Sequence, residues 1–343
     1  MKANQFTVRA RGPCTPSTGI FLSCCFPVLA IGALLVSGTA FAQSGRYYVT
    51  DESGFNRVWQ FQGGTLVSSF PTVPAGAADG PIIVDGNTNE VRSVKGGFNG
   101  GLGGGSPAVG SEYDFAGVVQ GPLSLDFTAH NGYGRVIDAA FDGQKTYIVA
   151  GLFGSAGVFR YNFDFSGPGT LMFNIGSAPQ NTAQGITYDT LTNTIWTSDY
   201  DFAAMATGGR VRQWSLTGTE LFSFPVVDNS GNASERNTAL AYDFSDDTFW
   251  MNAHVENTLG FGFGELWQFD RNGNFLQKIH ALQTTSGAPS NILYWGGEIY
   301  TVPEPASLAL FVSSIVLVSM RRHRRAGTDE GHPRLCPPRR NAS

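Results

Sequence analysis

Three residues able to bind a cation or to move a proton are Asp51, Asp199 and His254. Each stands at the end of a short run rich in Val, Thr or aromatic residues, a composition typical of β-strands. Carboxylate oxygens are ligands that Ca²⁺ prefers, and carboxylates and an imidazole can act as acid and base in a lyase-like enzyme. The alternative is that all three are solvated loop residues. The chain contains no nucleophile elbow, HExxH or EF-hand pattern that would decide between these interpretations.

The strand-like runs recur with a period of about 50 residues, the period of propeller repeats. Pairs of an aromatic residue and an aspartate end at Asp142, Asp189 and Asp243, which are 47 and 54 residues apart. Each unit holds four runs, and Thr217-Gly218 and Asn272-Gly273 separate the third run from the fourth as tight turns do. Four antiparallel strands per unit describe a propeller blade. In that fold Asp51, Asp199 and His254 would converge at the mouth of the central channel.

The number of blades depends on how the two ends pair. Residues 47–70 match runs two to four of a unit, a weaker copy follows at 82–125, and 291–301 reads as runs one and two. The sequence therefore predicts an all-β fold, a β-propeller of four-stranded blades spanning 43–301. It has five blades if the ends share one and six if they do not. A pair of β-sandwiches is the alternative, although it does not explain the regular unit.

The order of elements in each unit resembles NHL-like and related six-bladed propeller repeats. An apolar run ending in Asp is followed by an aliphatic or aromatic run, an aromatic run, a glycine turn and a run ending in Phe. The resemblance covers most of 46–301 and implies architecture, not activity. Asp189 and Asp243, which end the first runs of their units, are predicted to cap turns through Asx hydrogen bonds.

The first 42 residues have the three parts of a secretory signal peptide. Basic residues come first, an apolar stretch covers 20–36, and Ala40-Phe41-Ala42 supplies the small-residue ending that signal peptidase requires. We therefore expect export through the Sec machinery and cleavage after Ala42. An uncleaved membrane anchor is the alternative.

A second targeting segment lies at 302–325. Val302-Pro303-Glu304-Pro305 precedes a short apolar run, and an arginine cluster follows that run. The cluster consists of Arg321, Arg322, Arg324 and Arg325. Its charge should keep it cytoplasmic, which places the body on the other side of the inner membrane. The alternative is an ordinary C-terminal membrane anchor.

These three ordered parts resemble a PEP-CTERM sorting signal. The resemblance implies a Gram-negative bacterium that makes exopolysaccharide, and processing near Pro303-Glu304-Pro305 by an exosortase-type transpeptidase. The tail would enter the membrane only transiently, and the processed protein would reach the cell surface or the medium. Such tails usually stop after the arginine cluster, whereas this chain continues to Ser343, and we expect 326–343 to be disordered.

Composition excludes several classes of function. Residues 43–302 carry 12 Lys and Arg against 24 Asp and Glu, a formal charge of −12, which disfavours nucleic acids and anionic membranes as partners. All four cysteines lie outside this body, so disulfides and cysteine-ligated zinc are excluded from it. No motif requires a cofactor, and the one cation that the channel-mouth residues could bind is Ca²⁺. The leading hypothesis is a non-enzymatic, surface-delivered propeller that binds extracellular polysaccharide or matrix and envelope proteins. An exported lyase or hydrolase acting at the channel mouth is the alternative.

Overall fold

The computed structural model describes residues 45–51, 56–73, 79–95, 108–126, 133, 136–151, 156–176, 181–201, 209–234, 236–254, 265–280 and 294–300. The chain divides into two compact units, 1–40 and 41–343, and every described residue belongs to the second. Among the described residues, no helix has the length and apolar character needed to cross a membrane. The predicted signal peptide (1–42), sorting tail (302–325) and extension (326–343) lie outside the described residues.

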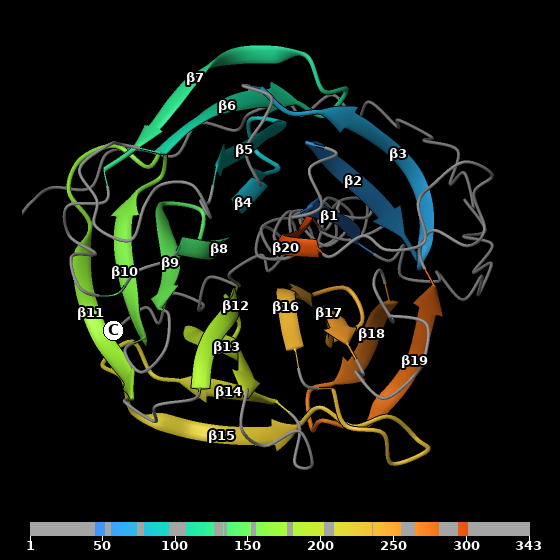
Figure 1. The fold of residues 1–343 in the computed structure, drawn as a ribbon. Helices are drawn as coiled ribbons and strands as arrows, with labels where there is room; N and C mark the ends of the chain where they lie inside the picture. Colours follow the sequence, from blue (N-terminus) through green and yellow to red (C-terminus); the bar gives the residue numbers. More distant parts are fainter. Residues whose placement is uncertain are drawn as a thin grey trace, which may run out of the picture. The chain divides into compact units, whose positions relative to one another are not determined.

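The second unit contains 20 described strands, arranged as the five four-stranded blades of a β-propeller (Figure 1). Blade 1 contains β1 (Arg46–Asp51), β2 (Arg57–Gln62), β3 (Thr65–Pro71) and β20 (Tyr294–Tyr300). Blade 2 contains β4 (Asp79–Asp85), β5 (Glu90–Lys95), β6 (Ala108–Asp114) and β7 (Val119–Leu125). Blade 3 contains β8 (Val136–Phe141), β9 (Lys145–Gly151), β10 (Ala156–Asn162) and β11 (Thr170–Gly176). Blade 4 contains β12 (Asn181–Asp189), β13 (Thr194–Asp201), β14 (Arg210–Trp214) and β15 (Glu220–Pro225). Blade 5 contains β16 (Arg236–Asp243), β17 (Thr248–His254), β18 (Glu265–Asp270) and β19 (Phe275–His280).

The ring closes within blade 1, because β20 from the end of the body pairs with β1 from its beginning. The two ends therefore share one blade, and the count left open by the sequence is five. The prediction that 291–301 forms two runs is wrong. Gly296 and Gly297, read as a break, lie inside β20. A Cβ on Gly296 would lie 2.2 Å from the carbonyl oxygen of Gly80, and one on Gly297 would lie 2.5 Å from that of Ala239. The pair thus lets the innermost strands approach closely.

In blades 4 and 5 the first hairpin is held by its aspartate, as predicted. Asp189 Oδ1 accepts the backbone N–H groups of Leu191 and Thr192, and Asp243 Oδ1 accepts that of Ser245. The Asx-turn interpretation of both aspartates is confirmed.

The glycine turns and the Phe-ending strands form one repeated contact between blades. A Cβ on Gly117 would lie 2.4 Å from Phe70, and one on Gly273 would lie 2.4 Å from Phe224 of the preceding blade. A Cβ on Gly218 would likewise lie 2.5 Å from Phe173 of the preceding blade. All three glycines have positive φ, so a larger residue would be both strained and in collision. This contact explains why the sequence repeat couples a glycine turn to a final Phe.

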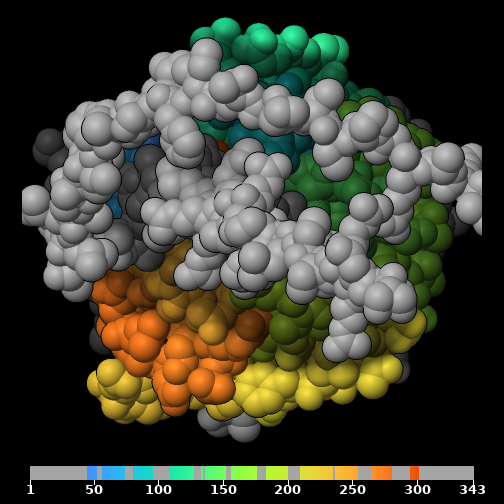
Figure 2. All heavy atoms as spheres, turned by 180° about the vertical axis from the view of Figure 1, so that it is seen from behind, coloured from blue at the N-terminus to red at the C-terminus, as the bar shows by residue number. Residues whose placement is uncertain are grey.

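The core consists of apolar clusters packed between neighbouring blades. Trp250 and Leu266 of blade 5 pack with Tyr47 and Phe61 of blade 1, for example. Seen from behind, the orange residues of blade 5 lie beside the yellow residues of blade 4 (Figure 2). All six tryptophans are buried, with exposed fractions of 7% or less. Five of them belong to the apolar clusters between blades, namely Trp59, Trp196, Trp214, Trp250 and Trp267, whereas Trp295 packs with Ile137 of β8.

Candidate functional site

The two ends of the strands carry different connections. Hairpin turns between first and second strands, and between third and fourth strands, contain two to seven residues. The remaining connections, which antiparallel order places at the opposite end, contain four to 13 residues, and the longest is 281–293. We call the end with these longer connections the loop face and the other end the turn face. Because binding residues concentrate on loops held by a rigid scaffold, the loop face is the candidate site.

Side chains of two innermost strands meet near the propeller axis. Strands β8 and β20 are not neighbours in the ring, yet their Cα atoms come within 8 Å of one another. Near the loop face, Trp295 of β20 packs against Ile137 of β8, and both are buried. Below them lie the buried carboxyls of Asp138 and Glu298. Among the described residues, Trp295 and Ile137 therefore occupy the axis at the end where the channel mouth was predicted.

Asp51 ends β1 at the loop face, and its side chain is buried. Its Oδ2 accepts hydrogen bonds from the backbone N–H of Arg57 and from Trp59 Nε1, both at 3.1 Å. These bonds stay within blade 1 and fix the start of β2 relative to the end of β1.

Asp199 lies near the end of β13 and is also buried. Arg212 Nε donates to its Oδ2 at 2.6 Å, and Arg212 also contacts Glu220 at 3.1 Å. Burial raises the pKa of Asp199 to about 6, an effect that the guanidinium of Arg212 opposes only in part. A carboxyl with a pKa near neutrality can exchange a proton with a substrate, provided that the substrate reaches it.

His254 ends β17 at the same face, and its side chain lies outside the described residues. In the backbone register, Arg236 of β16 is flanked by Tyr200 of β13 and His254 of β17. The ends of the strands that carry Asp199 and His254 are thus two strand spacings apart, about 10 Å. Asp51 belongs to a different blade, and its described bonds hold it there. Of the three predicted residues, the fold brings the strand ends of Asp199 and His254 near each other.

A layer of buried polar residues beneath the loop face was not predicted from the sequence. Asn252 Nδ2 donates to Thr238 Oγ1 at 3.1 Å, and Thr238 in turn donates to the carbonyl of Tyr294. Asn237 Nδ2 donates to the carbonyl of Asp199 at 3.1 Å. Asn237 and Thr238 lie in β16 before a register shift between Thr238 and Ala241, so no regular alternation marks them in the sequence.

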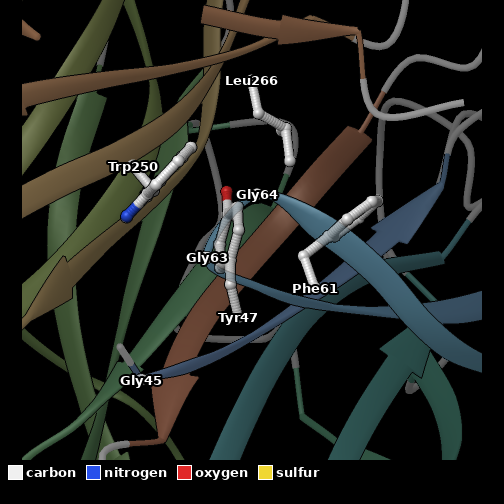
Figure 3. A pocket seen from close by; sticks show the side chains of 7 residues that line it. All are labelled: Gly45, Tyr47, Phe61, Gly63, Gly64, Trp250 and Leu266. Carbon is white, nitrogen blue, oxygen red and sulfur yellow. The ribbon is translucent and has the colours of Figure 1, made fainter. Parts of the chain in front are cut away.

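Among the described residues, no group of three or more His, Cys, Asp or Glu side chains is arranged to hold a metal ion. A small pocket between blades 1 and 5 is lined by Gly45, Tyr47, Phe61, Gly63, Gly64, Trp250 and Leu266. In Figure 3, Tyr47 lies between Trp250 and Phe61. The pocket has room for about one water molecule, so it is too small for an organic ligand.

The comparisons with known proteins found similar solved structures but no family for this chain. No family model matches the chain, and no curated protein matches its sequence. A protein of unknown function from Bacteroides caccae is 11% identical, with a TM-score of 0.46, covering 76% of this chain and 100% of that one. The WD40 propeller domain of Doa1 is 14% identical, with a TM-score of 0.35, covering 69% and 66%. The glutaminyl cyclase of Myxococcus xanthus is 12% identical, with a TM-score of 0.38, covering 71% and 81%.

Proposed function

We propose that this chain is an exported, surface-delivered β-propeller that binds extracellular polysaccharide or a matrix protein through its loop face, without catalysing a reaction. The observation that carries the proposal is the contrast between an axis where side chains of β8 and β20 meet and a face that carries the longest connections. With side chains on the axis, the rim and the loops are the surface proposed to bind, which suits recognition of an extended polymer better than enclosure of a small substrate.

The sequence of the two ends supports the cellular setting. The signal-like segment 1–42 accounts for export, and Val302-Pro303-Glu304-Pro305 with its apolar run and arginine cluster accounts for sorting. Mass spectrometry of the mature protein from its native host tests this part. We expect a new N-terminus at Gln43 and a new C-terminus near Pro303–Pro305, whereas a cytosolic chain with both original ends contradicts export.

Binding is tested with matched charge substitutions on the two faces. Val73 follows β3 at the loop face and is 46% exposed, and Leu191 lies in a turn-face hairpin and is 69% exposed. On a glycan array and against host envelope extract, we expect Val73→Glu to weaken binding at least several-fold and Leu191→Glu to leave it unchanged. Equal effects of the two substitutions, or no binding by the parent protein, argue against recognition at the loop face.

The burial of the tryptophans limits the contacts through which the protein could bind a sugar. Sugar binding often uses exposed aromatic faces, and none of the six tryptophans offers one. The proposal therefore relies on polar and backbone contacts from the loop face.

An exported lyase or hydrolase is the second candidate, and the raised pKa of Asp199 favours it. A general acid or base with a pKa of about 6 would give a rate that changes between pH 5 and 7. Turnover of polysaccharides by the parent protein that Asp199→Asn abolishes would establish this candidate. Binding without turnover would reject it.

A further inference from the structure

Both ends of the described body lie at the turn face. In the strand register, Arg46 of β1 is flanked by Gln62 of β2 and Tyr300 of β20. Gln62 leads into the turn 63–64, which belongs to the turn face. The chain therefore leaves the body at the turn face, from β20, the innermost strand of blade 1 (Figure 1).

The point of exit is fixed by packing. The ring of Tyr300 lies 5.2 Å, centroid to centroid, from that of Phe115, which follows β6 in a turn-face hairpin. Gly86, in the first hairpin of blade 2, lies so close to the same ring that a Cβ would collide with it. Strand pairing and these contacts hold Tyr300 in place, so the segment that follows starts from a defined position.

That segment is too short to reach around the propeller. Seven residues, 301–307, separate Tyr300 from Leu308, where the apolar run begins. Fully extended, they span at most about 25 Å. A path to the loop face crosses three outer strands of blade 1 and the height of the blade, about 35 Å for strands of six or seven residues. A membrane that holds the apolar run can therefore meet the turn face, whereas the loop face stays out of reach.

The turn face is acidic. Its nine connections all lie within the described residues, and with the strand ends beside them they carry 11 acidic and 3 basic side chains, a formal charge of −8. The acidic members are Asp85, Glu90, Asp114, Asp142, Asp164, Asp189, Glu220, Asp243, Asp246, Asp247 and Asp270, and the basic members are Arg46, Lys145 and Arg271. Anionic lipids attract basic segments and repel acidic ones, over about 8 Å at physiological salt.

We propose that, before its tail is cut, the protein is held with its turn face directed toward the membrane and its loop face directed away, and that the charge of the turn face keeps the body off anionic lipid. Insertion of 308–320 in a membrane belongs to the proposed function, on which this orientation rests. The binding surface then points outward, and the segment with Pro303-Glu304-Pro305 bridges the space between body and bilayer.

Energy transfer to labelled lipids tests the orientation. In the full-length chain the four cysteines are replaced by serine, and a dye is attached through Leu191→Cys at the turn face or Val73→Cys at the loop face. Each chain is reconstituted into phosphatidylcholine vesicles with a headgroup-labelled acceptor lipid. We expect at least twofold more transfer from position 191, because the faces are about 20 Å apart. Thr88→Cys and Asn229→Cys repeat the comparison at a second pair of exposed positions.

Equal transfer from the two faces, or more from the loop face, overturns the orientation. A chain that does not float with the vesicles contradicts the membrane setting of the proposed function as well, so the two failures are distinguishable.

Added lysines test the effect of charge. Gln144→Lys with Thr217→Lys adds two charges to the turn face, and Asn229→Lys with Ser230→Lys adds two to the loop face, all at exposed positions. At low salt, we expect less transfer from position 191 on vesicles with phosphatidylglycerol than on neutral ones. The turn-face lysines should reduce this difference, the loop-face lysines should leave it unchanged, and high salt should remove it. Identical transfer on neutral and anionic vesicles overturns the role of charge.

Discussion

The carboxylate of Asp243 accepts a hydrogen bond from the backbone N–H of Gly45 at 2.8 Å, which joins residues 198 positions apart. The same side chain caps the first hairpin of blade 5 through the N–H of Ser245. One aspartate of the repeat thus shapes its own turn and also ties the last blade to the chain segment that enters the first.

Replacing Asp243 by alanine should therefore cost more than replacing an aspartate that caps a turn only. Asp142 binds the N–H groups of Gln144 and Lys145 and the hydroxyl of Tyr147, all within blade 3. We expect a loss of roughly 2–3 kcal/mol for Asp243→Ala, because the buried Gly45 donor loses its partner, and about 1 kcal/mol for Asp142→Ala. Urea unfolding measures both. Equal losses would contradict a role for Asp243 between the blades.

The glycine turns offer a second matched pair. Gly273 has φ +85° and would place a Cβ 2.4 Å from Phe224, whereas Gly231 has φ +80° and open space around it. Gly231→Ala should cost about 1 kcal/mol through backbone conformation alone. Gly273→Ala should cost roughly 2–4 kcal/mol, because the neighbouring blade must move. The difference in stability loss between the two variants, measured by thermal unfolding, gives the contribution of the contact between the blades. Equal losses would show that the Gly–Phe contact contributes nothing.

The ion pair of Asp199 and Arg212 should affect the stability of the fold in a pH-dependent way. The pKa of Asp199 is raised from 3.8 to about 6, so its contribution to the free energy of unfolding is most favourable below pH 3.8 and becomes less favourable as the pH rises to 6. Arg212→Gln removes the cation that opposes this shift. We expect a small loss of stability at pH 4 and a loss of roughly 3 kcal/mol at pH 8, where the carboxylate is charged and unpaired.

Arg210→Gln is the control for that substitution. Arg210 is exposed on the same strand and donates to Ser223. Its replacement should change stability by less than about 0.5 kcal/mol at either pH. A loss for Arg212→Gln that is the same at pH 4 and pH 8 would mean that the guanidinium acts through packing alone.

Truncation tests ring closure directly. A chain ending at Thr301 keeps β20, and a chain ending at Leu293 lacks it. Because β20 pairs with β1 and packs against β4 and β16, we expect the first chain to unfold cooperatively like the parent body. The second should expose β1 as an open edge, lose cooperativity and become sensitive to protease. Similar unfolding curves for the two chains would exclude β20 as the closing strand.

Much of the scaffold was predictable because its signals are local. The runs around Thr194–Asp199 and Thr248–Asn252 have strand composition, and Asp189 and Asn272-Gly273 mark turns whose hydrogen bonds span only a few residues. The candidate residues Asp51 and Asp199 were correctly placed at strand ends. The arginine partner of Asp199 was not predicted, because Arg212 lies on the next strand and its alignment depends on the register.

The amino-acid sequence alone determined the repeat, the four-stranded unit and the turn chemistry, and it predicts targeting segments at the two ends, since each of these depends on residues close together in the chain. Only the tertiary structure decided that the ring has five blades, that Gly296 and Gly297 lie inside a strand, and that Asp138 and Glu298 meet on the axis. The physical reason is the same in each case. The innermost strands come from five distant segments, and which groups face one another across the axis is set by ring closure, a contact between the first and last strands that no local pattern encodes.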